Sequence, residues 1–214
     1  MKTIVCFGDS NTHGYDSKTM GRFEKQIRWT GYLQNELGEK YDIVEEGLSG
    51  RTTVFEDPLT EGLNGLDMIY PVLMSHEPVD LLIVMLGTND VKQRFHATPE
   101  NIAKGLERLI QKAKSTQEAF QSEPKILIIA PAPIEKGYED TFVYGEMGPD
   151  CVEKTEKLVS LYEEVAKKND CFFLDAGSIP GMGMYPYDYM HLSPEAHEAL
   201  AKELTCLIPS LFER

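Results

Sequence analysis

One run of six apolar residues, 81–86, limits the folds open to this chain more than any other feature. It reads Leu-Leu-Ile-Val-Met-Leu, so a strand made from it has no face suited to water. Such a strand belongs in the middle of a parallel sheet that is covered by helices on both faces. Four further short apolar runs are candidates for its neighbours, at 3–8, 43–44, 126–130 and 171–174.

Amphipathic segments alternate with these apolar runs. Apolar residues recur at helical spacing in segments that lie around 29–37, 66–73, 102–110, 158–165 and 200–207. Thr98-Pro99 and Ser193-Pro194 each predict a helix start, with a capping hydroxyl before a proline at the first helical position. Strands followed in turn by helices indicate right-handed crossovers and an α/β fold. We therefore expect one domain over 1–214, a three-layer α/β/α sandwich on a five-stranded parallel sheet in the flavodoxin-like order 2-1-3-4-5.

The charge balance argues against two classes of partner. With 21 Lys and Arg against 35 Asp and Glu, the net charge is −14, which disfavours nucleic acid and anionic membranes. No apolar stretch approaches the roughly twenty residues that span a bilayer. The four cysteines are scattered without a CxxC spacing, and the first methionine leads straight into a strand. We expect a reduced, cytoplasmic protein.

Polar turns follow the predicted strands at the points where each one ends. The first strand ends in Gly-Asp-Ser-Asn at 8–11, the second in a turn over 47–53, and the third in Gly-Thr-Asn-Asp at 87–90. In the order 2-1-3-4-5 the carboxyl ends of strands one and three are neighbours, and ligands of such sheets bind there. The turns should therefore meet in one crevice, with Ser10 beside Asn89.

A serine in such a crevice becomes a nucleophile only when a base takes its proton. Histidine suits that task near neutral pH, and His191 lies three residues after Asp188 in the loop before the last helix. The carboxylate can then orient the imidazole, which makes Ser10, His191 and Asp188 a candidate catalytic triad. The backbone N–H groups of Ser10 and Gly50 and the side chain of Asn89 are the candidate oxyanion-hole donors.

Four motifs carry a family resemblance. Gly8-Asp9-Ser10-Asn11, Ser49-Gly50, Gly87-Thr88-Asn89-Asp90 and Asp188-x-x-His191 resemble, in order, the four conserved blocks of the SGNH (GDSL-type) hydrolases. Segments 28–31 and 46–53 resemble the arylesterase and acyltransferase branch of that family. The resemblance implies the SGNH-hydrolase fold and a serine esterase for small, short-acyl or aryl esters, with transfer to alcohols as a second activity. It implies no cofactor and no metal, and it favours a homo-oligomer.

The resemblance is incomplete at two positions. Asn11 stands where the motif that names the family has leucine, and we expect no contact with the chemistry there. The glycine donor of the second block is Gly50 or Gly47, of which we favour Gly50 because it follows Ser49. Asp9 is expected to accept backbone bonds within its turn. We place four residues along the substrate pocket: His13, Trp29, Arg51 and Met190.

Two other kinds of function stay open on the sequence alone. A metal-dependent phosphoesterase is the first, because oxygen and nitrogen ligands for a metal ion could come from Asp9, Asn89, Asp90, Asp188 and His191. The chain could also be a binding protein without catalysis on a flavodoxin-like scaffold, although its first loop carries a carboxylate where an anion would sit. The long loop over 131–150 is a lid, a subunit contact or a surface loop.

Overall fold

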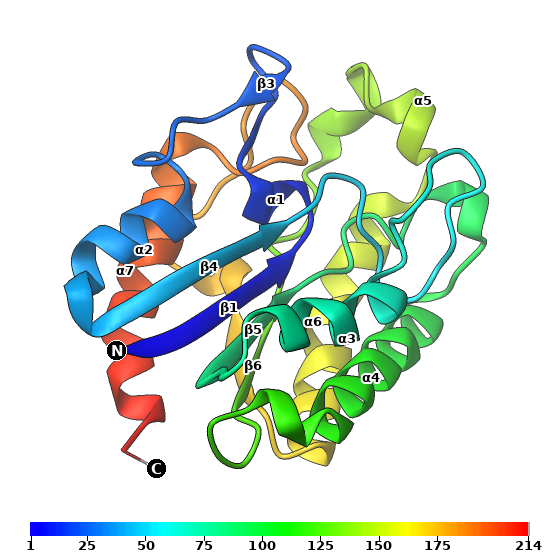
Figure 1. Cartoon of the computed structure of the whole chain (residues 1–214). Helices are drawn as coiled ribbons and strands as arrows, with labels where there is room; N and C mark the ends of the chain where they lie inside the picture. The colour runs from blue at the N-terminus through cyan, green and yellow to red at the C-terminus, as the bar shows by residue number, and fades with distance from the viewer. Residues whose placement is uncertain (214) are drawn as a thin grey trace.

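The computed structural model describes residues 1–213, and its centre is one parallel sheet of five strands (Figure 1). The strands lie in the order β4-β1-β5-β6-β7, and each pair of neighbours is parallel. Numbered by their place in the sequence-based analysis, this is the predicted order 2-1-3-4-5, which is confirmed. The strands are β1 (Lys2–Gly8), β4 (Tyr41–Gly47), β5 (Leu81–Met85), β6 (Ile126–Ala130) and β7 (Phe172–Asp175).

The middle strands are buried on both faces, as the apolar run predicts. Every residue of β5 and of β6 is buried, whereas the edge strands β4 and β7 are only partly covered. An edge strand can carry polar residues on its open side, which is why the apolar core of β4 was recognisable in the sequence only at Ile43 and Val44.

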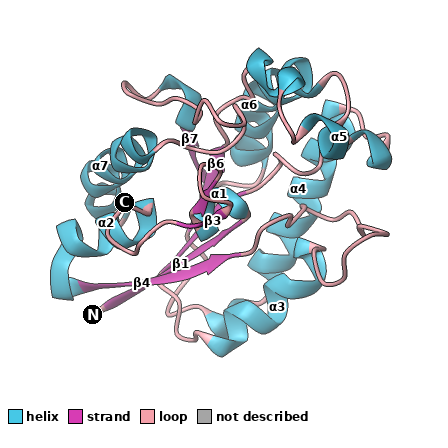
Figure 2. Cartoon of the chain, turned by 90° about the horizontal axis from the view of Figure 1, so that it is seen from above, coloured by secondary structure: helices cyan, strands magenta, loops and turns pink. Residues whose placement is uncertain are grey.

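Helices cover both faces of the sheet and complete three layers (Figure 2). Helices α2 (Trp29–Leu37) and α7 (Pro194–Leu211) pack on one face, and α3 (Gly65–Ser75), α4 (Pro99–Ser115) and α6 (Cys151–Lys168) on the other. Side chains alternate along β1, so that Ile4 and Cys6 join the α2 and α7 layer while Val5 and Phe7 join the other. The predicted α/β/α sandwich is confirmed.

The two predicted helix starts are confirmed at their caps. Thr98 Oγ1 accepts the N–H of Asn101 at 3.3 Å, with α4 starting at Pro99. Ser193 Oγ accepts the N–H of Ala196 at 3.2 Å, with α7 starting at Pro194. Proline at the first helical position loses no helical hydrogen bond, so the local sequence alone determines these boundaries.

Several short elements were not predicted because they are too short to show a period. They include a two-stranded hairpin, β2 (Tyr15–Asp16) with β3 (Gly21–Arg22), in the segment expected to be a loop. Two helices of one turn are α1 (Ser10–His13) and α5 (Tyr144–Met147), and the 3-10 turns are η1 (Gly38–Lys40), η2 (Gln93–Phe95), η3 (Gln117–Ala119), η4 (Lys136–Asp140) and η5 (Ala176–Ser178). Within residues 1–213, no helix has the length and apolar character needed to cross a membrane.

Candidate active site

Ser10 is the first residue of α1, directly after a sharp turn at the end of β1. Asp9 caps α1, and its Oδ1 accepts the N–H of Asn11 at 2.9 Å. A Cβ atom on Gly8 would lie 2.1 Å from Thr12 Oγ1, so the turn can be this tight only with glycine there. Gly14 then ends the helix after one turn in the left-handed conformation, at φ 81°. The backbone thus presents the Ser10 side chain at the carboxyl end of the sheet.

His191 reaches Ser10 from the other end of the chain. Its Nε2 lies 2.9 Å from Ser10 Oγ, across 181 residues of sequence. Its Nδ1 lies 2.6 Å from Asp188 Oδ2. Because Nδ1 faces a carboxylate it carries the proton, and Nε2 is left to accept the hydroxyl proton of Ser10. The structure therefore brings together all three residues of the predicted triad, each of them buried.

Asp188 is held in place by its own loop. Its Oδ1 accepts the N–H groups of Met190 and His191, both at 3.0 Å, and the residue has no exposed surface. Burial acts to raise the pKa of Asp188, but the hydrogen bonds and charge of His191 outweigh it and keep that pKa below its usual value. The carboxylate is therefore ionised at neutral pH and can stabilise an imidazolium.

Tyr15 packs against the imidazole and was not predicted from the sequence. The two ring centroids are 4.6 Å apart with planes inclined by 50°. Tyr15 comes from β2, directly after the Gly14 that ends α1, so the short hairpin carries it over His191. Its only signal in the sequence is an aromatic residue immediately after the nucleophile turn.

Three hydrogen-bond donors lie around Ser10. Within residues 1–213, the backbone N–H groups of Ser10 and Gly50 have no hydrogen-bond acceptor. Asn89 Nδ2 donates to the carbonyl oxygen of Arg51 at 3.2 Å and, at the long end of the range, to Asp9 Oδ2 at 3.4 Å. These two acceptors fix the side of the amide that carries hydrogen. The N–H groups of Ser10 and Gly50 can donate to an anionic oxygen at Ser10, and Asn89 Nδ2 can join them by exchanging its long contact with Asp9 Oδ2 for that oxygen.

Gly47 and Gly50 have different structural roles. Gly47 is paired with Gly8 at the end of β4, and a Cβ on it would lie 2.1 Å from the backbone nitrogen of His13. Gly47 therefore lets α1 pack against the sheet. Gly50 lies on the wall of the cleft with φ +89°, where a Cβ would meet only the side chain of Leu63, at 2.9 Å. Its position fits a backbone donor.

Ser10, Asn89 and His191 open into a cleft of about 280 Å³. Part of its wall comes from the end of the 131–150 loop, so this segment contributes to the cleft instead of lying apart from it. The apolar and aromatic residues of the cleft lining are Tyr15, Leu63, Phe142, Val143, Met147 and Met190, and its further lining residues are Ser49, Gly50, Asp57, Thr60, Lys92 and Glu146. Most of these residues stand in loops and carry no periodic signal in the sequence.

Ion pairs join three of the segments that line the cleft. Lys92 Nζ lies 3.1 Å from Glu146 Oε1, and Arg94 Nη1 lies 3.3 Å from Asp57 Oδ1. Arg94 also pairs with Glu146. Asp57 and Lys92 are buried, whereas Glu146 is exposed, so the pair of Asp57 with Arg94 is better shielded from solvent than the pairs made by Glu146. Together these contacts link α5 to the loops that follow β4 and β5.

Three of the four residues predicted to line the pocket lie elsewhere, which corrects that prediction; only Met190 lines the cleft. Trp29 is fully buried beneath α7, and its backbone N–H donates to His197 Nδ1 at 3.2 Å. Arg51 is buried over the ring of Phe7, 4.1 Å from its centroid, and donates to the carbonyl oxygen of Gly8 at 2.9 Å.

The same burial lowers the pKa of Arg51 to about 10. His13 lies beside Arg22, whose Nε donates to its carbonyl oxygen at 2.8 Å. The directions of these three side chains follow from tertiary packing, which a motif does not specify.

The carboxylates named for a metal site are engaged in separate hydrogen bonds. Asp90 Oδ1 accepts the N–H of Thr53 at 2.9 Å, while Asp9 and Asp188 bind the backbone of their own turns. Burial raises the pKa of Asp9 to about 6 and that of Asp90 to about 7. In the part of the chain that the structure describes, no three His, Cys, Asp or Glu side chains are grouped as ligands for a metal ion.

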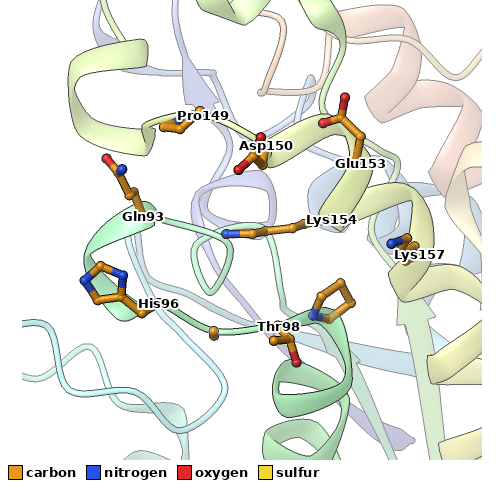
Figure 3. A pocket seen from close by; sticks show the side chains of 10 residues that line it. Gln93, His96, Thr98, Pro149, Asp150, Glu153, Lys154 and Lys157 are labelled. Carbon is orange, nitrogen blue, oxygen red and sulfur yellow. The ribbon is translucent and has the colours of Figure 1, made fainter.

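A larger hollow, of about 520 Å³, lies between α4 and the start of α6 (Figure 3). Gln93, His96 and Thr98 line one side of it, and Asp150 and Lys154 the other. Its side chains include no serine or cysteine hydrogen-bonded to a base. The smaller cleft at Ser10 is therefore the candidate active site.

Comparison with known proteins agrees with this geometry. Residues 6–199 match the model of the GDSL-like Lipase/Acylhydrolase family. Among solved structures, a carbohydrate acetylesterase family member from Sinorhizobium meliloti is 34% identical with a TM-score of 0.90, and 100% of each chain is covered. The native aryl esterase of M. smegmatis is 33% identical with a TM-score of 0.88, over 99% of this chain and 100% of that one.

No protein of curated function matches the chain. The family match covers most of the sequence, and relatives above 30% identity align over nearly all of it. The chain therefore belongs to the GDSL-like lipase/acylhydrolase family and is a carboxylic ester hydrolase.

Proposed function

We propose that this enzyme is a serine esterase that hydrolyses small esters with short acyl groups, such as acetyl, through an acyl-enzyme on Ser10. One observation carries the proposal. Ser10 Oγ lies 2.9 Å from His191 Nε2, and His191 Nδ1 lies 2.6 Å from Asp188 Oδ2, in one buried chain of hydrogen bonds. This arrangement has the nucleophile, the base and the orienting carboxylate that acyl transfer needs.

In the first half-reaction, His191 Nε2 takes the hydroxyl proton as Ser10 Oγ attacks the ester carbonyl carbon. The carbonyl oxygen becomes an oxyanion and accepts hydrogen bonds from the N–H groups of Ser10 and Gly50 and from Asn89 Nδ2. Asp188 stabilises the imidazolium that forms. The intermediate then collapses, the bond to the leaving oxygen breaks, and His191 donates its proton to that oxygen.

The second half-reaction repeats this sequence with water. His191 takes a proton from the water as it attacks the acyl carbon, and Ser10 leaves with the proton returned. An alcohol that enters the cleft in place of water would accept the acyl group instead. The enzyme would then act as an acyltransferase to alcohols, a second activity of the same site.

The size of the cleft favours small substrates. Its volume of about 280 Å³ lies just below the usual range for small-molecule sites, roughly 300–1,000 Å³. Phe142 and Met147 are among its lining residues, and we expect them to limit the length of an acyl chain. The similar proteins named above are a carbohydrate acetylesterase family member and an aryl esterase, which supports an acetyl or aryl ester as substrate.

The direct test is hydrolysis of an aryl acetate by the wild type and by Ser10→Ala. We expect Ser10→Ala to lose at least about 10³-fold in kcat. A serine-directed phosphonate should inactivate the wild type, and a chelator should leave its activity unchanged. Full activity in Ser10→Ala would contradict the proposal, and loss of activity in chelator alone would point to a metal-dependent enzyme instead.

A further inference from the structure

Asn11 directly follows the candidate nucleophile and contacts the chain on both sides of the candidate base. Its Oδ1 accepts the N–H of Leu192 at 2.9 Å, and its Nδ2 donates to the carbonyl oxygen of Met190 at 3.4 Å. Both contacts are buried and span about 180 residues of sequence, with separations of 181 and 179. The Asn11 side chain is thus hydrogen-bonded to the backbone of the residue before His191 and of the residue after it.

We propose that Asn11 is a positioning residue that holds His191 within hydrogen-bond distance of Ser10. This inference rests on the proposed function, in which the Ser10–His191 contact transfers the proton. It differs from the sequence-based expectation, in which position 11 had no part in the chemistry.

The contacts of Asp188 do not by themselves position His191 relative to Ser10. Asp188 bonds to His191 and to the N–H groups of residues 190 and 191, all within one loop. Glu135 ties the same loop to the segment after β6, since its N–H donates to the carbonyl oxygen of Tyr189 at 2.9 Å. Neither contact fixes the loop relative to α1, where Ser10 lies.

Asn11 supplies that link. Apart from the bond between Ser10 and His191, its two bonds are the hydrogen bonds that join α1 to the 188–192 loop within residues 1–213. Tyr15 packs against the His191 ring and Tyr185 donates its backbone N–H to the His191 carbonyl oxygen, but neither contact is a hydrogen bond between this loop and α1. The link is rigid because Asn11 is buried and its own N–H is bound to Asp9.

The residue type matches the task. An asparagine amide presents an acceptor and a donor side by side, so it can bind a backbone N–H and a backbone carbonyl two residues apart. Leucine, which the family's motif has at this position, has the same side-chain branching, is somewhat larger and can make neither bond. Aspartate keeps an acceptor for Leu192 but loses the donor for Met190.

The test is Asn11→Leu, assayed on an aryl acetate with unfolding measured in parallel. A shift of the order of 1 Å in a reacting group can cost about 10²-fold, so we expect kcat to fall about 10- to 100-fold with KM changed by less than about threefold. Asn169→Leu is the matched control. Asn169 Nδ2 donates to the carbonyl oxygen of Val165 at 2.9 Å, at the amino-terminal edge of the sheet and far from Ser10. It should leave kcat unchanged.

A double-mutant cycle separates positioning from a general structural role. If Asn11 acts through His191, Asn11→Leu should lower the residual activity of His191→Ala by less than about twofold, since no base remains to be positioned. Should Asn11→Leu fail to fold, Asn11→Asp carries the same test, with a smaller loss of kcat that is again absent without His191.

Two results would overturn the inference: wild-type kcat in Asn11→Leu, or the same fold loss with and without His191. Either result leaves the proposed function standing as long as Ser10→Ala is inactive. An active Ser10→Ala would instead remove the proposed function itself.

Discussion

Asp188→Asn separates the orienting role of Asp188 from its role in folding. In the wild type, Oδ1 accepts two backbone N–H groups and Oδ2 accepts His191 Nδ1 at 2.6 Å. The amide oxygen of asparagine can keep the first two bonds, which places its NH₂ group against Nδ1. Nδ1 must then become an acceptor, so the proton moves to Nε2, and Nε2 can no longer accept the proton of Ser10.

The wrong tautomer should lower kcat by about 10³- to 10⁴-fold, the loss seen for this exchange in other serine hydrolases. That corresponds to about 4 to 5 kcal/mol of transition-state stabilisation. Stability should suffer less, because only one charge-assisted hydrogen bond is lost, at about 1.5 to 3 kcal/mol. Asp188→Ala loses all three bonds and should be less stable than Asp188→Asn, with a similarly low kcat.

The assay combines initial rates on an aryl acetate with urea unfolding of the wild type and the two variants. A folded Asp188→Asn enzyme that keeps more than about a tenth of the wild-type kcat would refute the reasoning, since the tautomer would then not matter.

Two further predictions concern the residues around the site. Burial raises the pKa of Asp90 to about 7 from 3.8, so its protonated form stabilises the fold at low pH, and that contribution is lost as the pH rises through about 7. Between pH 5 and pH 8, the free energy of unfolding measured in urea should therefore fall by about 2 to 3 kcal/mol less in Asp90→Asn than in the wild type. An equal fall in both proteins would contradict this. Gly50→Ala should fold, with about 1 to 3 kcal/mol of backbone strain, and should have a lower kcat. Gly47→Ala should lose both its fold and its activity, because the new Cβ would lie 2.5 Å from the backbone carbonyl carbon of Thr12. A stable, active Gly47→Ala would show that α1 can move.

The strand order and the three polar turns that follow β1, β4 and β5 could be predicted because they depend on local patterns. The apolar run of β5 marks a central strand, and parallel strands bring their carboxyl ends to one edge. Ser10, Asn89 and His191 stand at that edge in three separate turns, so topology alone brings them close. That these three residues lie close together could therefore be expected without any information on side-chain packing.

The walls of the cleft could not be predicted in the same way. Trp29 and Arg51 lie in segments that resemble the family, but which way a side chain points depends on the packing of neighbouring elements. Trp29 packs under α7 and Arg51 over Phe7, where a buried surface was available to each. Phe142 and Met147 line the cleft from a loop whose conformation no periodic pattern specifies.

Asn11 shows another reason why part of the site could not be predicted from the sequence. As a departure from the family's motif it looked neutral, because a motif compares residue types and not their contacts. Its two bonds involve backbone atoms of residues 190 and 192, which any side chains there would supply equally well. No pattern in the sequence marks such a partner, so only the folded structure reveals it.

The measurement that most directly tests the central claim is the intact mass of the enzyme after brief exposure to an activated acetyl ester and an acid quench, followed by peptide mapping. The account predicts one added acetyl group per chain, on the peptide that contains Ser10, and no such adduct in Ser10→Ala. An unmodified Ser10 in an enzyme that is turning over, or an acetyl group mapped to another residue that forms as fast as turnover, would contradict it.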